Sequence, residues 1–196
     1  MKSNLLKYLF ITCLTAGIFI SCEKDDEKSD KIIVKLGAQS NTSIGAFYSV
    51  GEDKVYTQAL AFNNQDTIDM LCFYEVTDAR QNYTSISSPG GGISGIFTGE
   101  TSTEVWTTKK LTKFTDPVTD ITPAEFDQLE NEDAVIASYF DNTVTSGFKK
   151  RTNLQVDDIY AFKTQDGITG LFKVTEVVGG NDGYLEIELK IKSPSK

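Results

Sequence analysis

The chain has 196 residues, of which 39% are hydrophobic and 24% are charged. This composition is typical of one globular domain with short additions, and it excludes a disordered chain or a polytopic membrane protein. The 28 acidic residues outnumber the 19 basic ones, and the net charge of −9 repels nucleic-acid phosphates, so no nucleic-acid partner is expected. There is no histidine, which excludes Ser-His and Cys-His catalysis and imidazole metal ligation. We therefore expect a non-enzymatic protein without cofactor or metal.

The first residues have the pattern of a secretory leader. Residues 8–20 form an almost wholly apolar run of 13 residues after two lysines. A membrane-spanning helix needs about 20 apolar residues, whereas the core of a signal peptide needs about 7–15. The run ends in Phe-Ile-Ser-Cys at residues 19–22, which resembles a lipobox, where a small residue precedes a cysteine that receives a diacylglycerol. This resemblance implies a lipoprotein signal peptide over residues 1–21 and lipidation of Cys22. An ordinary signal peptide is the alternative, but no Ala-X-Ala-like cleavage site lies nearby.

A charged tether follows over residues 22–31. Eight of the nine residues from 23 to 31 are charged, and such a segment stays solvated because it has nothing to bury. Its acidic start resembles the export signal of surface lipoproteins in the Bacteroidetes group. The residues that carry this resemblance are Glu23, Asp25, Asp26 and Glu27. It implies a protein anchored in the outer membrane by its acyl chains and facing the extracellular side. A spacer without sorting content is the alternative interpretation.

Residues 32–196 have the pattern of a single β-rich domain. Alternating or short apolar runs are separated by Gly, Asn and Asp, which is typical of strands joined by turns. The predicted strands cover residues 32–36, 46–50, 55–59, 67–76, 93–98, 104–107, 158–164, 169–178 and 184–191. We expect a mainly β, α+β fold: an antiparallel β-sandwich or distorted barrel.

The last three strands carry the strongest signals. Asp166-Gly167 is a dipeptide that suits a two-residue type I′ hairpin turn, and residues 179–183 form a longer second turn. The final strand alternates cleanly between apolar and charged residues. The predicted core side consists of Leu185, Ile187, Leu189 and Ile191, and the predicted solvated side consists of Glu186, Glu188, Lys190 and Lys192.

One or two short helices are predicted around residues 122–140, across an open end of the sheets. Thr122 is an N-cap residue, Pro123 suits the first helical position, and Glu125 completes a capping box. Asn131 lies where the helical stripe is interrupted, so a second short helix could begin there.

Two further parts of the chain resemble surface lipoproteins of the Bacteroidetes group. Residues 34–41, 45–50, 55–57 and 68–70 in the first half, and residues 158–164 and 170–174 in the second, are similar to a pattern that recurs in those proteins. The shared motifs are structural. The resemblance therefore implies location and family, and it implies no activity.

Candidate functional residues are few. Trp106, in a threonine-rich polar stretch, fits either the core or a ligand-stacking face, and the core is the favoured interpretation. Tyr83, expected in a loop, is the second candidate for ligand binding. Thr67 lies in an Asp-Thr-Ile sequence that looks like an O-glycosylation acceptor of the same bacterial group. Cys72 is expected to be a buried apolar side chain in a central strand covered on both faces.

Two formal motifs are weak. Gly90, Gly92 and Gly95 have the G-x-G-x-x-G spacing, but a dinucleotide site needs a preceding strand and a following helix, so we expect a surface loop. A carboxylate-pair hydrolase needs no histidine, yet nothing in the sequence selects a pair among the 28 acids.

The leading hypothesis is a non-enzymatic, lipid-anchored surface protein whose β-domain binds a ligand or partner, with a glycan as one candidate. The alternative is a structural or assembly subunit of an outer-membrane complex, and a carboxylate-dependent hydrolase is a third. These hypotheses differ in what they require of the surface: a binding cleft, a large exposed apolar patch, or two facing acids.

Overall fold

The computed structural model describes residues 31–76, 82–117, 120–140 and 148–194. Within these ranges the fold is mostly β, with ten strands and a few short helices. The strands are β1 (Ile32–Gly37), β2 (Phe47–Ser49), β3 (Lys54–Tyr56), β4 (Met70–Glu75), β5 (Tyr83–Ser87), β6 (Lys113–Pro117), β7 (Lys150–Arg151), β8 (Ile159–Lys163), β9 (Thr169–Val178) and β10 (Tyr184–Lys192). The helices are α1 (Gln58–Phe62) and α2 (Pro123–Phe126), with 3₁₀ turns η1 (Pro89–Gly91), η2 (Thr103–Val105) and η3 (Ala134–Tyr139).

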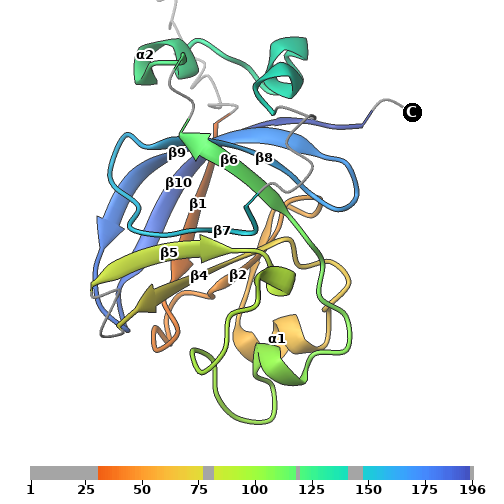
Figure 1. The fold of residues 1–196 in the computed structure, drawn as a ribbon, viewed down its shortest axis with the longest axis vertical. Coiled ribbons are helices and arrows are strands. Elements are labelled where there is room, and N and C mark those ends of the chain that lie inside the picture. Colours follow the sequence, from red (N-terminus) through yellow and green to blue (C-terminus); the bar gives the residue numbers. More distant parts are fainter. Residues whose placement is uncertain (1–30, 77–81, 118–119, 141–147, 195–196) are drawn as a thin grey trace, which may run out of the picture.

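The strands form two five-stranded antiparallel sheets that pack face to face (Figure 1). The order of the first sheet is β1-β10-β9-β8-β6, and that of the second is β3-β2-β4-β5-β7. Phe114 in β6 forms an isolated antiparallel bridge with Phe148, just before β7, so the sheets approach each other along one seam. The predicted α+β, sandwich-like fold is confirmed, and the sheets do not close into a barrel over the described residues.

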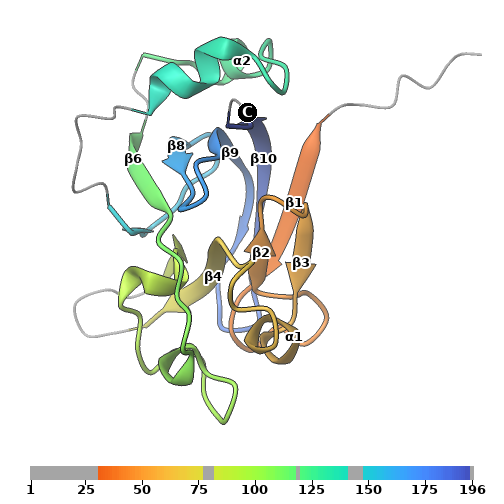
Figure 2. The ribbon, with the colours of Figure 1, turned by 90° about the vertical axis from the view of Figure 1, so that its right-hand side faces the viewer.

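Apolar side chains fill the space between the sheets and also cover both outer faces. The central core joins residues of β1, β8, β9 and β10 in the first sheet to residues of β2, β4 and β5 in the second. A second cluster lies on the outer face of the β4 sheet, beneath α1 and the loop around Phe97 and Trp106. A third lies on the outer face of the β9 sheet, beneath α2 and η3 (Figure 2). Both sheets are therefore covered on two sides, which explains the long apolar runs in the sequence.

β4 is the central strand that its sequence predicts. It lies between β2 and β5, and Met70, Leu71, Cys72 and Phe73 are all fully buried. Burial raises the pKa of the Cys72 thiol to about 12, against a small opposing effect of a backbone hydrogen bond with Leu185. Because only the thiolate is nucleophilic, we expect this buried thiol to be unreactive in the folded protein.

The helical segment is also confirmed. Thr122 is the N-cap of α2, its hydroxyl accepts a hydrogen bond from the Glu125 amide at 3.2 Å, and its own amide donates to the Glu125 carboxylate at 2.7 Å. α2 ends at Phe126, and η3 begins at Ala134, so the predicted interruption near Asn131 is observed. The Asn131 side chain accepts a hydrogen bond from the Ile191 amide at 3.0 Å, which holds this interruption against β10.

Several predicted strands are wrong. Residues 93–98 are an irregular loop, in and beside which Gly92, Gly95 and Gly99 have positive φ. In place of the predicted strand at residues 104–107, the 3₁₀ turn η2 ends at Val105. Residues 58 and 59 belong to α1, whose N-cap is Thr57.

β5, β6 and β7 were not predicted. β5 carries buried serines and a threonine on a strand enclosed by its neighbours, and such residues give no apolar alternation in the sequence.

The β8–β9 hairpin is confirmed, but its predicted turn type is wrong. Gly167 has a φ of 91°, whereas Asp166 is not among the positive-φ residues, so the two positive φ values of a type I′ turn are missing. The Gly167 amide instead donates to the Thr164 carbonyl at 3.1 Å, and the Thr164 amide donates to the Ile168 carbonyl at 2.9 Å. This is a three-residue loop with a glycine in the left-handed position.

The middle of the charged face of β10 is buried, contrary to the prediction from its alternation, whereas Glu186 and Lys192 at the ends of this face are half-buried. Glu188 is 3% exposed and Lys190 is 5% exposed, because α2 and its flanks cover this face. Glu188 forms ion pairs with Lys31 at 3.2 Å, with Lys190 at 3.5 Å and with Lys173 at 3.7 Å. Lys173 and Lys190 also lie over the Phe126 ring, at 5.0 and 5.7 Å from its centre. A buried carboxylate is retained here because three ammonium groups surround it.

Candidate functional site

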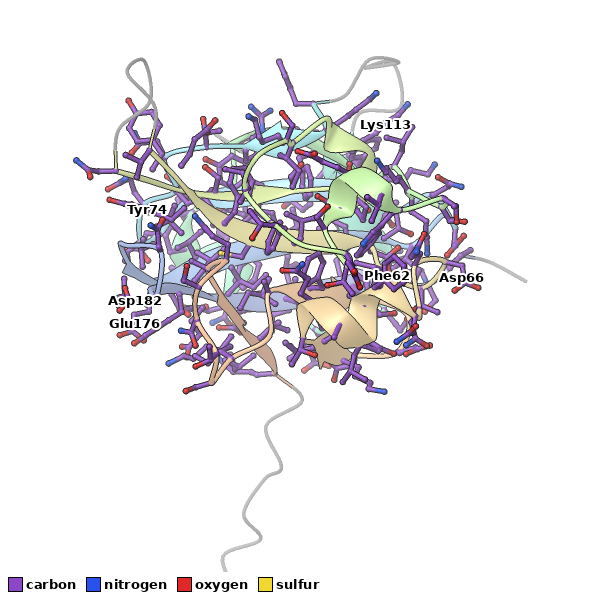
Figure 3. All side chains as sticks on the ribbon, turned by 90° about the horizontal axis from the view of Figure 1, so that it is seen from below. Phe62, Asp66, Tyr74, Lys113, Glu176 and Asp182 are labelled. Atoms are coloured by element: carbon purple, nitrogen blue, oxygen red, sulfur yellow. The ribbon has the colours of Figure 1, made fainter. Side chains whose placement is uncertain are left out.

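A cleft of about 370 Å³ lies at the end of the sheets where β1 finishes. Its residues come from the loop after β1, the end of β4, the start of α1, the loop after η1 and the β9–β10 turn: Gln39, Ser40, Gln58, Tyr74, Val76, Gly95, Ile96, Thr98 and Asn181. Figure 3 shows Tyr74 and Asp182, the neighbour of Asn181, on the same side of the molecule, with Phe62 and Asp66 on the other. The volume is at the lower end of the range of about 300–1,000 Å³ that is typical of small-molecule sites.

Gln39 forms one wall of the cleft by completing the edge of β4. β2 begins at Phe47, opposite Leu71, and does not extend to Tyr74, where the Gln39 amide takes its place. Its carbonyl accepts a hydrogen bond from the Tyr74 amide at 2.8 Å, and its Nε2 donates to the Tyr74 carbonyl at 2.9 Å. Nε2 also donates to the Asn181 side-chain oxygen at 2.9 Å. The side chain thus pairs with the strand as a peptide group would, and it links β4 to the β9–β10 turn.

The β9–β10 turn is fixed by the loop that follows β1. The Ser40 amide donates to the Asn181 carbonyl at 2.8 Å, and the Ala38 amide donates to the Gly183 carbonyl at 2.9 Å. The Asn41 side chain donates to the Asp182 and Gly183 carbonyls at 2.9 and 3.1 Å. These hydrogen bonds hold Asn181 in place although its side chain is exposed.

The opposite wall is the loop that contains Gly95, Ile96 and Thr98. Phe97 anchors it, because its ring lies 4.8 Å from the Phe47 ring in the outer cluster on the β4 sheet. Gln58 Nε2 donates to the Thr98 carbonyl at 2.9 Å and to the Thr101 hydroxyl at 3.0 Å. The wall therefore rests on an aromatic core, with polar contacts to α1.

Trp106 supports this wall and lies in the core. It is 4% exposed, its ring centre lies 5.3 Å from that of Phe47, and its indole N–H donates to the Thr101 carbonyl at 3.1 Å. The favoured core interpretation agrees with this burial, and no face of the indole is open to a ligand. Trp106 is linked to this wall by its hydrogen bond to Thr101 and by Phe47, whose ring contacts both Trp106 and Phe97.

Tyr83, the second aromatic candidate, does not line the cleft. It is the first residue of β5 and is half-buried, whereas the sequence placed it in a loop. It pairs with Glu75, and adjacent residues of a strand face opposite sides, so Tyr83 shares the face of Glu75 and not that of Tyr74.

Thr67 lies in a second, smaller pocket of about 160 Å³. Its half-buried hydroxyl donates to the Asn64 carbonyl at 3.1 Å, and its glycosylation stays a prediction. The pocket is acidic, but Lys110 lies between two of its carboxylates: its ammonium is 2.8 Å from Asp69 and also pairs with Asp166. Burial lowers the pKa of Lys110, and the hydrogen bonds to both acids outweigh that effect and raise it.

Asp69 is committed to structural contacts within this pocket. Its second carboxylate oxygen accepts a hydrogen bond from the Val50 amide at 2.9 Å. Burial raises the pKa of Asp69, and the Lys110 ammonium partly opposes this rise. Both oxygens are therefore engaged, so Asp69 is not a free member of the carboxylate pair that a hydrolase needs.

The remaining predicted features can be placed briefly. Cys22, Glu23, Asp25, Asp26 and Glu27 lie outside the described residues. The glycine-rich stretch forms η1 and an irregular loop, which is not the strand-turn-helix context of a dinucleotide site, and Gly95 from it lines the cleft. Within the described ranges, no group of three or more Asp, Glu or Cys residues could hold a metal ion.

None of the described helices is both long enough and apolar enough to span a membrane. Comparisons of the chain with protein-family models, curated proteins and solved structures find no match.

None of the nine residues that line the cleft was identified as a site residue from the sequence. Four of them carry the polar groups that shape it: Gln39, Gln58, Tyr74 and Asn181. They belong to four separate segments, and a neutral amide has no spacing rule of the kind that marks a metal or phosphate site. The one available signal was the Gly-Gly-Asn-Asp-Gly turn at residues 179–183, which places Asn181 on a surface loop.

Proposed function

We propose that this protein is a lipid-anchored lipoprotein of the outer membrane that faces the extracellular side and binds a ligand in the cleft between Gln39, Tyr74 and Asn181. The lipobox-like sequence ending at Cys22 and the acidic residues after it support the anchor. The cleft supports ligand binding, because it is preformed, mostly polar and held by hydrogen bonds from several elements.

The observation that carries the proposal is the position of the cleft relative to the start of β1. The chain enters the domain at Ile32, and Gln39 and Ser40 follow the other end of the same strand. Figure 2 shows β1 running from the end of the molecule that carries α2 to the end that carries α1. Six residues of β-strand span roughly 20 Å, so an anchor on the N-terminal side leaves the cleft facing away from the membrane.

This geometry can be tested with cysteine labelling on intact cells. Because the Cys72 thiol is fully buried, Ser40→Cys introduces an accessible thiol at the cleft, and Ala124→Cys introduces one in α2 at the opposite end. We expect a bulky, membrane-impermeant maleimide to label Ser40→Cys readily and Ala124→Cys more slowly. Both variants should be labelled equally in detergent, and the unmodified protein should not be labelled.

Two results would overturn the proposal. If Ser40→Cys is labelled in detergent but not on intact cells, the cleft does not face the medium. If a ligand captured from the surroundings by the unmodified protein binds equally well after a bulky label is attached at residue 40, the cleft is not its site.

A further inference from the structure

Several hydrogen-bonding groups of the cleft have no partner within the described residues. Asn181 uses its side-chain oxygen for Gln39, which leaves its Nδ2 donors free. Gln58 uses its Nε2 for Thr98 and Thr101, which leaves its Oε1 acceptor free. The hydroxyls of Ser40 and Thr98 also lie in side chains that line the cleft, and neither has a partner in the described part of the chain. The free set is therefore one amide donor, one amide acceptor and two hydroxyls.

This set matches a ligand rich in hydroxyl groups. A hydroxyl both donates and accepts hydrogen bonds, and the free groups of the cleft offer both roles. Val76, which is 59% exposed, and the half-buried Ile96 add apolar surface for the C–H face of a sugar ring. A sugar could therefore pair its hydroxyls with the free polar groups of the cleft and place its C–H face on Val76 and Ile96.

The cleft is poorly suited to a charged ligand. None of the nine described residues that line it is charged, although 24% of the whole chain is. A phosphate, carboxylate or ammonium would therefore find no opposite charge there. The net charge of −9 adds repulsion against anions.

A peptide added to the edge of β4 is also disfavoured. Strand addition requires free main-chain donors and acceptors at the edge of the sheet. At Tyr74 both groups are already paired with the Gln39 side chain.

We infer that the cleft binds a short, uncharged saccharide through Asn181, Gln58, Ser40 and Thr98. This inference rests on the proposed ligand-binding function and names the class of its ligand.

The test is binding of the purified full chain in detergent to a panel of immobilised probes. The panel contains neutral oligosaccharides of hexoses, deoxyhexoses and N-acetylhexosamines, acidic oligosaccharides, and peptides. Asn181→Asp keeps the oxygen that Gln39 contacts but replaces the free donor with a charge, and it should weaken neutral saccharide binding at least tenfold. Ser40→Ala removes one neutral hydrogen bond and should weaken it about two- to tenfold. Asp182→Asn is the matched control, because it changes the charge of the next residue outside the cleft lining, and it should have no effect.

The outcomes separate the two proposals, provided that all variants keep the thermal unfolding midpoint of the unmodified protein. The inference is supported if the unmodified protein binds a neutral saccharide, if Asn181→Asp and Ser40→Ala weaken this binding, and if Asp182→Asn leaves it unchanged. Binding of acidic saccharides or peptides alone, weakened by Asn181→Asp, overturns the saccharide class and leaves the ligand-binding function standing. Saccharide binding that no variant alters overturns the cleft as the site. No binding to any probe class contradicts both.

Discussion

At the scale of single residues, Gln39 shows how one side chain can take the place of a strand. Its amide completes the pairing of Tyr74 in the part of β4 that β2 does not reach, and it also contacts Asn181. An open strand edge is a site of unwanted pairing with other chains, and a side-chain amide that satisfies both backbone groups removes that hazard locally. The same amide shapes the cleft, so stability and the candidate site depend on one residue.

Cys72→Ser tests the burial of the central strand. A serine oxygen could accept the Leu185 backbone hydrogen bond, but its O–H donor would lie unpaired among fully buried apolar side chains, so we expect a loss of about 1–3 kcal/mol in the free energy of unfolding. Denaturant unfolding measures this loss. In the unmodified protein the thiol should react with reagents only after unfolding, and rapid labelling of the native protein would contradict the position of β4.

Trp106→Ala tests whether the indole supports the wall of the cleft. Loss of a buried ring packed on Phe47 should cost about 3–5 kcal/mol of stability. Trp106→Phe keeps an aromatic ring and loses only the N–H donor to Thr101, so it should cost clearly less. Denaturant unfolding of the two variants gives the comparison, and an unchanged unfolding midpoint for the alanine variant would argue against a core role.

At the scale of elements, α2 and η3 form a cover over one face of the β9 sheet. The cover buries Phe126 and Phe140 against Ile159 and Leu171, and it encloses the charged face of β10. Polar contacts tie it down as well, because Glu132 accepts hydrogen bonds from Lys192 and Ser193. The stability of this cover should therefore fall when either a buried apolar side chain or a member of an ion pair is replaced.

Thr122→Ala removes the capping box of α2. The variant loses the hydroxyl that accepts from the Glu125 amide, and an N-cap replacement of this kind costs about 0.5–2 kcal/mol. We expect the substitution to speed amide hydrogen exchange in residues 122–129, compared with the unmodified protein. Exchange in β9 and β10 should stay unchanged, because only the cover loosens. Thr122→Ser retains the cap and serves as the control. Equal exchange rates in the alanine and serine variants would show that the cap does not hold the cover.

The ion pair of Glu132 predicts a pH dependence of stability. Hydrogen bonds from Lys192 and Ser193 lower the pKa of the Glu132 carboxyl from 4.5 to about 2. The stabilisation is therefore present above pH 4.5 and is lost as the pH falls towards 2. Glu132→Gln should reduce the decline of the unfolding midpoint over this pH range. Identical pH profiles for the variant and the unmodified protein would assign the decline to other carboxylates.

At the scale of the whole molecule, β1 links the predicted anchor to the cleft. The strand begins next to Lys31, the last residue of the predicted tether, whose ammonium pairs with Glu188. It ends just before Gln39. The cleft and the point where the chain enters the described domain therefore lie at opposite ends of one strand.

Cys22→Ala tests the anchor. Acyl chains contribute about 0.8 kcal/mol per buried methylene, so a lipidated Cys22 would hold the protein at the membrane without a spanning helix. We expect the variant to be released in soluble form or to remain at the inner membrane with its signal uncleaved. Cell fractionation and the mass of the N-terminal peptide measure this. Normal outer-membrane fractionation of the variant would contradict the lipobox interpretation.

The features that the sequence determined by itself are those that depend on local order along the chain. The charge, the lack of histidine, the capping box at Thr122, the β8–β9 and β9–β10 hairpins, and the doubly covered β4 strand all follow from neighbouring residues. Each of them can be predicted from the spacing or the backbone preferences of residues that are close together in the chain. For this reason the β-rich, sandwich-like fold could be predicted.

Tertiary structure decided the features that depend on residues far apart in the chain. Only folding shows that α2 covers β10 and buries Glu188 and Lys190, whose alternation predicted a solvated face. Likewise the cleft brings Gln39, Gln58 and Asn181 together from separate segments, and Tyr74 is paired by a side chain 35 residues away. Packing and hydrogen bonding between distant segments create these environments, and a local sequence pattern does not indicate which segments come into contact.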